Sequence, residues 1–297
     1  MAESRLDRLV RRQGWMEGWG DAIQGAVGGI YGALGAPGRV LKDLMHGTRF
    51  LGHPLHPAIT DVPIGAWTVG VVADYAAHFT ARLPTEAGDI ALAVGLLAGM
   101  LAAISGYTDF HDTFAQERRV ALLHGLTMSV VQVVMFASLA LRWWAGPGAH
   151  PLAVGISTAG YVLVVFGGYF GGHVVFGSAT MVNHMAFVDG FEGAAEVGAS
   201  TDFPEGELRR VMASAMPVLM VRRGGQLFAI SATCTHAGGP LDEGSLDGFV
   251  VTCPWHASRF DVRTGRVRGG PATFSEPALH VVEAGGKVTV ELTEPLH

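Results

Sequence analysis

The sequence has 297 residues, which is long enough for two domains. Hydrophobic residues make up 49% of it and charged residues only 15%, a composition that favours a membrane protein over a wholly soluble one. The net charge of −6 argues against the basic surface that nucleic-acid binding requires, and the two cysteines are compatible with a reducing compartment.

Residues 1–50 are expected to form helices of their own. Residues 1–13 are polar and basic, no apolar run of signal-peptide form follows them, and Arg11-Arg12 lacks the context of a twin-arginine export signal. Residues 15–50 are rich in glycine and mildly amphipathic. Helices lying at the membrane interface, or a soluble helical hairpin that covers the membrane domain, explain this pattern equally well.

Four apolar segments follow, each long enough to cross a bilayer, for which about 20 residues suffice. They are Pro57–Thr80, Asp89–Tyr107, Val120–Trp144 and Leu152–Val175. Because the connections are short, neighbouring segments should pack antiparallel. The sequence therefore predicts an all-α four-helix transmembrane bundle over residues 51–178.

Basic residues near the ends of these segments predict their orientation. One end of the predicted bundle carries Arg39, Lys42, Arg49, Arg118 and Arg119. The opposite end carries Arg82 and Arg142. The positive-inside rule then predicts a multi-pass protein of the inner membrane with both termini in the cytoplasm.

Five histidines map to the cytoplasmic end of the predicted bundle, and we treat them as candidate cofactor ligands. They are His53, His56, His111, His124 and His173. Ionisable residues within a membrane are costly and usually functional. His124 and His173 lie on different segments at similar depth, so with His56 nearby they could hold a b-type haem. A quinone or metal site and a purely structural role remain open alternatives, whereas the absence of Cys-x-x-Cys-His argues against a covalently attached haem.

Residues 179–204 are polar and rich in small side chains, and they are expected to tether the bundle to a second domain at residues 205–297. This last part alternates as strands do, with glycine-rich turns in between. The expected strands are Pro217–Val221, Gln226–Ile230, Phe249–Thr252, His280–Val282 and Lys287–Leu292. The pattern predicts a small antiparallel all-β domain.

Cysteine and histidine occur in this domain at the spacing of an iron–sulfur site. Cys234-Thr235-His236 is followed by Cys253-Pro254-Trp255-His256. Two thiolates and two imidazoles in this order are the ligand set of a Rieske [2Fe–2S] cluster, in which the cysteines bind one iron and the histidines the other. We therefore predict Cys234, His236, Cys253 and His256 as metal ligands. The alternatives are a zinc site, whose usual spacing fits poorly, and a disulfide, although each cysteine has a histidine at ligand spacing.

Residues from about 205 to 295 resemble the Rieske ferredoxin family. The resemblance lies in the runs CTHAGGPL and CPWHASRFD and in the turn Gly269-Gly270-Pro271-Ala272. It implies two cluster-binding loops and a proline loop over the cluster, with Trp255 and Pro271 shielding the irons. The quinol-oxidising branch of the family has an additional cysteine pair and a tyrosine, where this chain has no further cysteine and Phe260. Because phenylalanine cannot donate a hydrogen bond to a cysteine sulfur, we expect a potential near about −150 mV, the low end of the Rieske range.

The run from Leu51 to Trp67, with its His-Pro-Leu-His-Pro signature, resembles an uncharacterised family of four-helix membrane domains that occurs alone and fused ahead of Rieske domains. This resemblance covers residues from about 35 to 185. It supports a multidomain membrane protein, a transmembrane bundle followed by a small all-β Rieske domain, and implies no activity.

The sequence thus predicts a membrane-anchored electron-transfer protein rather than a stand-alone enzyme. Single electrons would pass between a membrane partner, such as a bound b-type haem or a quinone, and a cytoplasmic redox protein. Alternatives are a quinone-linked oxidoreductase subunit, an anchored ferredoxin that serves a cytoplasmic oxygenase with a structural bundle, and a redox or iron sensor. The lipid bilayer is a further expected partner, and a homo-oligomer or larger redox complex is compatible with the sequence. The mononuclear iron site of oxygenases, with two histidines and a carboxylate in a large domain, is not expected, because the chain after Cys253 is too short to hold it.

Overall fold

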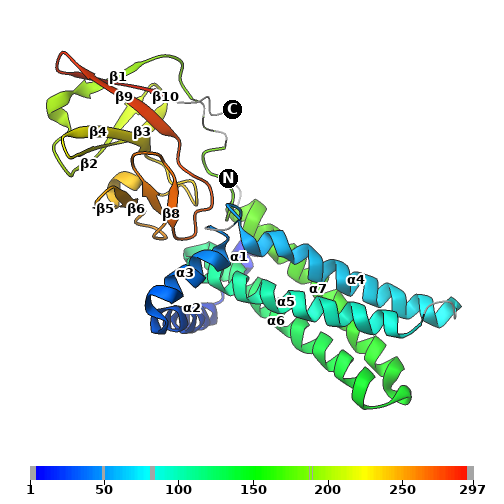
Figure 1. Ribbon diagram of the computed structural model, residues 1–297. Coiled ribbons are helices and arrows are strands. Elements are labelled where there is room, and N and C mark those ends of the chain that lie inside the picture. Colours follow the sequence, from blue (N-terminus) through cyan, green and yellow to red (C-terminus); the bar gives the residue numbers. More distant parts are fainter. Residues whose placement is uncertain (1–4, 49–50, 81–83, 187, 189, 293–297) are drawn as a thin grey trace. The chain divides into compact units, whose positions relative to one another are not determined.

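The computed structural model describes residues 5–48, 51–80, 84–186, 188 and 190–292. The chain divides into two compact units. The first contains residues 1–41 and 55–178 and is helical, and the second contains residues 42–54 and 179–297 and is built mainly of β-strands (Figure 1).

Four long helices form the body of the first unit, and they confirm the four expected helical segments. They are α4 (Leu55–Thr80), α5 (Glu86–His111), α6 (Ala115–Trp144) and α7 (His150–Ser178). At 1.5 Å per residue, each is longer than the bilayer core of about 30 Å. Among the described helices, α5, α6 and the segment Pro147–Ser178 are apolar enough to cross a membrane. A membrane span for α4 stays a prediction.

The helices form two tightly packed hairpins, α4 with α5 and α6 with α7, and glycines bring their backbones together (Figure 1). Trp67 on α4 is 1% exposed and lies against Gly95 of α5, where a Cβ atom would collide with the indole ring. On α6, Val134 and Met135 lie close against Gly160 of α7, where a Cβ atom would be 3.0 and 3.2 Å from them. Close approach at small residues is how helices associate in a membrane, where lipid offers apolar side chains an equally apolar surrounding.

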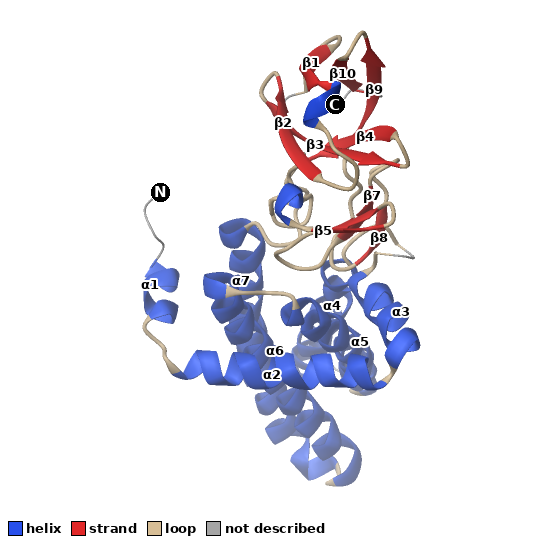
Figure 2. Ribbon diagram, turned by 90° about the vertical axis from the view of Figure 1, so that its left-hand side faces the viewer, coloured by secondary structure: helices blue, strands red, loops and turns tan. Residues whose placement is uncertain are grey.

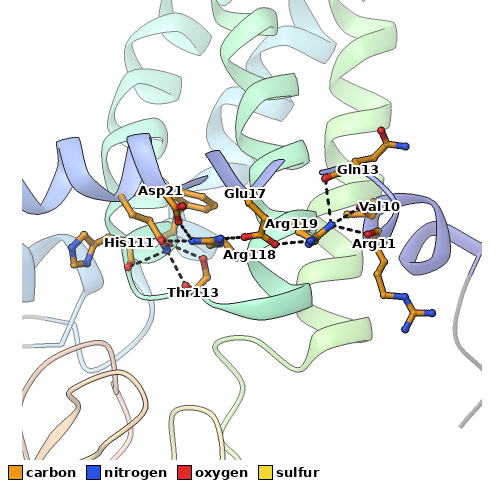
Figure 3. Close-up of polar contacts among 11 residues, drawn as sticks. Val10, Arg11, Gln13, Glu17, Asp21, His111, Thr113, Arg118 and Arg119 are labelled. Carbon is orange, nitrogen blue, oxygen red and sulfur yellow. Dashed lines mark hydrogen bonds and ion pairs between the residues drawn. The ribbon is translucent and has the colours of Figure 1, made fainter. Parts of the chain in front are cut away.

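Three shorter helices precede the bundle: α1 (Arg5–Arg11), α2 (Trp15–Ala33) and α3 (Gly35–His46). Helix α2 runs across the end of the bundle (Figure 2), and Figure 3 shows the polar contacts that hold it there. Gln24 donates hydrogen bonds to the carbonyls of Phe110, His111 and Thr113 at distances of 3.0, 3.3 and 2.8 Å. Since the last carbonyls of a helix have no partner within it, Gln24 caps α5.

Ion pairs complete the contact between α2 and the bundle. Glu17 binds both Arg118 and Arg119, and Asp21 accepts a hydrogen bond of 2.6 Å from Arg118 (Figure 3). The outer side of α2 remains apolar, with Trp15 48% and Trp19 57% exposed. The helix thus covers the bundle end, and its place at a membrane interface stays a prediction.

The second unit consists of two antiparallel sheets. The larger has the order β1 (Ala195–Ala199), β10 (Lys287–Leu292), β9 (Ala278–Ala284), β4 (Gln226–Ser231), β3 (Met216–Arg223) and β2 (Leu208–Ala213). The smaller has the order β5 (Ser245–Asp247), β6 (Val250–Thr252), β7 (Arg259–Asp261) and β8 (Val267–Gly269).

The five expected strands are confirmed as β3, β4, β6, β9 and β10. Strands β1, β2, β5, β7 and β8 were not expected. Three of them have only three residues, too few for a period-of-two pattern to emerge. Strand β1 lies within the expected tether and pairs with β10, so the β-structure begins before residue 205.

Candidate iron–sulfur centre and the membrane histidines

The two predicted ligand loops have the same backbone conformation. In one, the Cys234 amide donates to the carbonyl of Gly239 and the Gly238 amide donates to the carbonyl of Cys234, both at 2.8 Å. In the other, Cys253 makes the corresponding bonds with Ser258 and Ala257, at 2.8 and 3.1 Å. Gly238 and Ala257 occupy equivalent positions with φ of 75° and 58°. The first loop follows β4 of the larger sheet, and the second joins β6 to β7 of the smaller sheet.

The four donors converge as two pairs. Cys234 and Cys253 are 1% and 3% exposed, form no disulfide and share a hydrogen bond between their side chains. The rings of His236 and His256 lie with centroids 4.8 Å apart at 79°. In the part of the chain that the structure describes, no three such donors lie close enough to hold one metal ion. This division into a thiol pair and an imidazole pair suits a two-iron cluster, with one pair for each iron, and does not suit a single tetrahedral zinc.

The thiol pair is prepared for metal binding. The hydrogen bond from Cys234, together with the backbone amides of Trp255 and His256, lowers the pKa of Cys253 below its usual value. The same thiol–thiolate hydrogen bond, followed by burial, raises the pKa of Cys234. The lowered pKa favours the thiolate, which is the form of cysteine that binds iron.

The five membrane histidines do not form one group. His56 of α4 and His124 of α6 make a ring contact with a centroid distance of 6.0 Å. His173 instead lies 3.1 Å from the carboxylate of Asp7 on α1. The Nδ1 atom of His111 is 2.9 Å from Asp112, and that of His53 is 3.0 Å from the carbonyl of Pro54. The expected pairing of His124 with His173 is thus replaced by a pairing with His56.

Comparison with known families accounts for both units. Residues 194–282 match the Rieske [2Fe-2S] domain, and residues 52–184 match a family described as predicted membrane protein (DUF2231). The ferredoxin CarAc of Metapseudomonas resinovorans is 38% identical over 96 residues, which are 32% of this chain and 90% of that protein. The chain belongs to the Rieske [2Fe–2S] family.

A second Rieske relative is the ferredoxin component of biphenyl 2,3-dioxygenase from Rhodococcus jostii (strain RHA1). It is 36% identical over 97 residues, or 33% of this chain and 91% of the relative. Among solved structures, the ferredoxin of carbazole 1,9a-dioxygenase from Nocardioides aromaticivorans IC177 is 30% identical, with a TM-score of 0.33 and coverage of 34% of this chain and 100% of that one. Homology to ferredoxins implies electron transfer by the Rieske domain.

The Rieske loops are supported by residues that the sequence analysis missed. Glu276 is 3% exposed and accepts a hydrogen bond of 2.7 Å from the backbone amide of Thr235, which lies between two predicted ligands. Burial raises the pKa of Glu276 well above its usual value. The loop Gly269-Gly270-Pro271 is held from the segment of residues 42–54, where Asp43 accepts from the Gly270 amide at 3.0 Å and Thr48 donates to its carbonyl at 2.8 Å. The Glu276 contact spans 41 positions and those of Asp43 and Thr48 span more than 200, so no local pattern could have revealed them.

Proposed function

We propose that the chain is a membrane-anchored Rieske electron carrier whose cluster is bound by Cys234 and Cys253 on one iron and by His236 and His256 on the other. The observation that supports this most directly is the arrangement of the four donors as two pairs on equivalent loops. The cluster supplies a couple that accepts and donates one electron.

The protein chain would shield this redox couple from water and hold its ligands in fixed positions. Thiols that are almost fully buried keep water from one iron, and the amides around each cysteine hold the loops in place. A Cβ atom on Gly239 would lie 2.8 Å from the sulfur of Cys253 and 3.1 Å from the Trp255 ring, so the first loop closes tightly over the second. Trp255 is itself 49% exposed, whereas His236 and His256 are 6% and 7% exposed, so the indole is the part of the second loop that a redox partner can contact.

The relatives of the Rieske domain suggest which class of protein exchanges electrons with it. Several of them are named as ferredoxin components of dioxygenase systems, for biphenyl and for p-cumate. We therefore propose a cytoplasmic redox protein, such as an oxygenase component, as one partner of this Rieske domain. A quinone or a cofactor within the bundle is the proposed partner on the membrane side.

The orientation in the membrane is part of this proposal. Arg142 was expected at the opposite end of the bundle, near a connection between helices. It is instead buried in the bundle, where it forms ion pairs with Asp74 and Asp89. Arg118 and Arg119 remain at the opposite end, on the side of α2, whereas Arg49 and Arg82 lie outside the described residues. This asymmetry supports an inner-membrane protein with the Rieske domain in the cytoplasm.

The test is electron paramagnetic resonance of the full-length protein in detergent after reduction with dithionite, with iron and zinc analysis on the same sample. We expect a rhombic [2Fe–2S] signal and about two cluster irons per chain. Cys253→Ser and His256→Ala should abolish the signal. His280→Ala should leave it unchanged, since that histidine is exposed on β9 of the same unit.

The alternatives give different results in this experiment. One zinc per chain without a paramagnetic signal would contradict the assignment of a cluster. A cluster that quinol reduces rapidly in the isolated protein would favour a quinone-linked oxidoreductase subunit. If apo and cluster-loaded forms bound a partner with different affinity but exchanged no electrons with it, a sensor would be favoured instead.

A further inference from the structure

The bundle contains a pair of facing histidines outside the Rieske domain. His56 lies in the first turn of α4 and His124 lies inside α6, so they come from different helical hairpins. Their ring centroids are 6.0 Å apart and their planes are inclined by 74°. Both side chains are partly rather than fully buried. The pair is therefore a feature of the interface between the two hairpins.

Each imidazole is oriented by a carbonyl of the other helix in its own hairpin. Nδ1 of His56 lies 2.8 Å from the carbonyl oxygen of Ala102 on α5, and Nδ1 of His124 lies 2.9 Å from that of Gly167 on α7. A carbonyl oxygen can only accept, so Nδ1 carries the proton and the lone pair of each neutral ring is on Nε2. A backbone carbonyl on the remote nitrogen is the arrangement typical of metal-binding histidine.

Glycines fix the position of both rings. A Cβ atom on Gly106 would lie 2.8 Å from Cε1 of His56, and one on Gly171 would lie 3.0 Å from Cε1 of His124. Each glycine follows, by one helical turn, the residue whose carbonyl accepts the hydrogen bond of that ring. Larger residues at these positions would displace the imidazoles from the interface.

The first helices of the two hairpins, α4 and α6, correspond at three pairs of positions. The distance along the chain from His56 to His124 equals that from Trp67 to Met135 and that from Asp74 to Arg142. All three pairs hold equivalent places: the first is in ring contact, the second packs on Gly95 and Gly160, and the third forms a buried ion pair. The histidine pair thus occupies matched positions of two related hairpins, where a symmetric ligand would receive the same contact from each side.

We propose that His56 and His124 are the axial ligands of a haem bound between the two hairpins. Metal–imidazole bonds of about 2.0–2.1 Å, placed in line on opposite sides of an iron, hold ring centroids about 6 Å apart. Among the described residues, no third histidine, cysteine or carboxylate joins this pair to make a metal site. Two protein ligands leave a bare ion incompletely coordinated, whereas a haem iron already has four porphyrin nitrogens and takes two axial imidazoles.

The remaining histidines of the bundle have other roles. His173 is in contact with the carboxylate of Asp7, and His111 with that of Asp112. With both axial positions filled by imidazole, the iron has no site for oxygen or substrate. The bound haem is therefore a one-electron carrier, Fe(III) to Fe(II), which gives the membrane unit a redox couple of its own.

The test is a pyridine haemochrome assay and electron paramagnetic resonance on the oxidised full-length protein, purified in detergent from cells supplied with a haem precursor and then titrated with hemin. We expect one b-type haem per chain and a low-spin ferric signal of strongly anisotropic form. That form follows from axial imidazole planes close to perpendicular, as the angle of 74° requires.

Variants separate ligation from general damage to the bundle. His56→Ala and His124→Ala should each convert the low-spin signal to high-spin or remove it, and His124→Met should keep a six-coordinate iron with a shifted spectrum. Gly106→Ala should alter the low-spin signal, whereas Gly168→Ala, with open space around its Cα, should not. His78→Ala, at the opposite end of α4, should retain the wild-type signal.

Either of two results would overturn the proposal. One is a wild-type protein that remains monodisperse and binds less than one tenth of an equivalent of hemin, and the other is a stoichiometric haem whose low-spin signal survives both His56→Ala and His124→Ala. Binding of copper, zinc or a quinone by the pair without haem would count as the first result. The cluster signal is read separately, so Cys253→Ser should lose the cluster and keep the haem, and failure of one proposal is distinguishable from failure of the other.

Discussion

Glu276 is a buried acidic residue that is hydrogen-bonded to the backbone of a Rieske ligand loop. The residue is 3% exposed, and its carboxyl group accepts a hydrogen bond from the amide of Thr235, between Cys234 and His236. Burial is the main cause of its raised pKa, and the negative charge on Cys253 acts in the same direction. The folded protein therefore binds a proton at Glu276 more tightly than the unfolded chain does.

This shift predicts how stability changes with pH. A carboxyl group whose folded pKa is raised contributes fully below its unfolded pKa of about 4.3, and this contribution decreases as pH rises towards the folded pKa. Glu276→Gln keeps an acceptor for the Thr235 amide without the proton dependence. We expect the urea midpoint for loss of cluster absorbance to be higher in Glu276→Gln than in wild type at pH 8, with a smaller difference at pH 5.5. The exposed Glu243→Gln serves as control, and an equal effect of both substitutions at both pH values would contradict the assignment.

At the scale of elements, one buried arginine joins all four long helices. Arg142 of α6 binds Asp74 of α4 through two hydrogen bonds of 2.7 and 2.6 Å, Asp89 of α5 at 3.0 Å and Ser157 of α7 at 3.1 Å. The side chains of Arg142 and Asp74 are both 0% exposed. Because lipid offers these charges no solvation, the ion pair requires both partners.

Removal of one partner should destabilise the bundle strongly. Asp74→Asn leaves the arginine charge buried without its main counter-charge, and we expect a loss of about 3–5 kcal/mol, the usual cost of breaking a buried pair from one side. Asp89→Asn should cost less, because Asp89 is 19% exposed and contributes a single bond. Thermal unfolding in detergent, followed by size exclusion, measures the difference. Equal melting temperatures for Asp74→Asn and wild type would show that the pair is not needed.

Elements could be predicted from sequence where a pattern was long enough to read. Apolar segments of about 20 residues predicted all four long helices, and alternation between glycine-rich turns predicted β3, β4, β6, β9 and β10. Three-residue strands such as β5 and β7 offer no such pattern. The pairing of His124 with His56 could not be predicted either, because the depth of a residue in the membrane does not tell which side of its helix it occupies. The carboxylate of Asp7 on α1 contacts His173, and Asp7 belongs to a polar, basic segment whose sequence gave no reason to expect this contact.

At the scale of the whole molecule, the sequence predicts the ligands of the Rieske domain but not the contacts that support them. The Rieske ligands could be predicted from spacing alone, since cluster chemistry fixes residue type and order within two short loops. The contacts that support these loops, from Glu276 and from Asp43 and Thr48, come from distant parts of the chain. Orientation in the membrane is a property of the whole chain that the distribution of its basic residues predicts.

Cysteine labelling in intact cells measures this orientation. The native Cys234 and Cys253 are 1% and 3% exposed, so they should react little with a maleimide that does not cross membranes. A cysteine introduced at the exposed Gly148, between α6 and α7, should react from outside the inner membrane. One introduced at the exposed Arg12, between α1 and α2, should react only after the cells are lysed, because the positive-inside rule places that end in the cytoplasm. The opposite labelling pattern would place the Rieske domain on the outer side, where a cytoplasmic oxygenase could not reach it, and its electron partner would then have to be sought among proteins of that compartment.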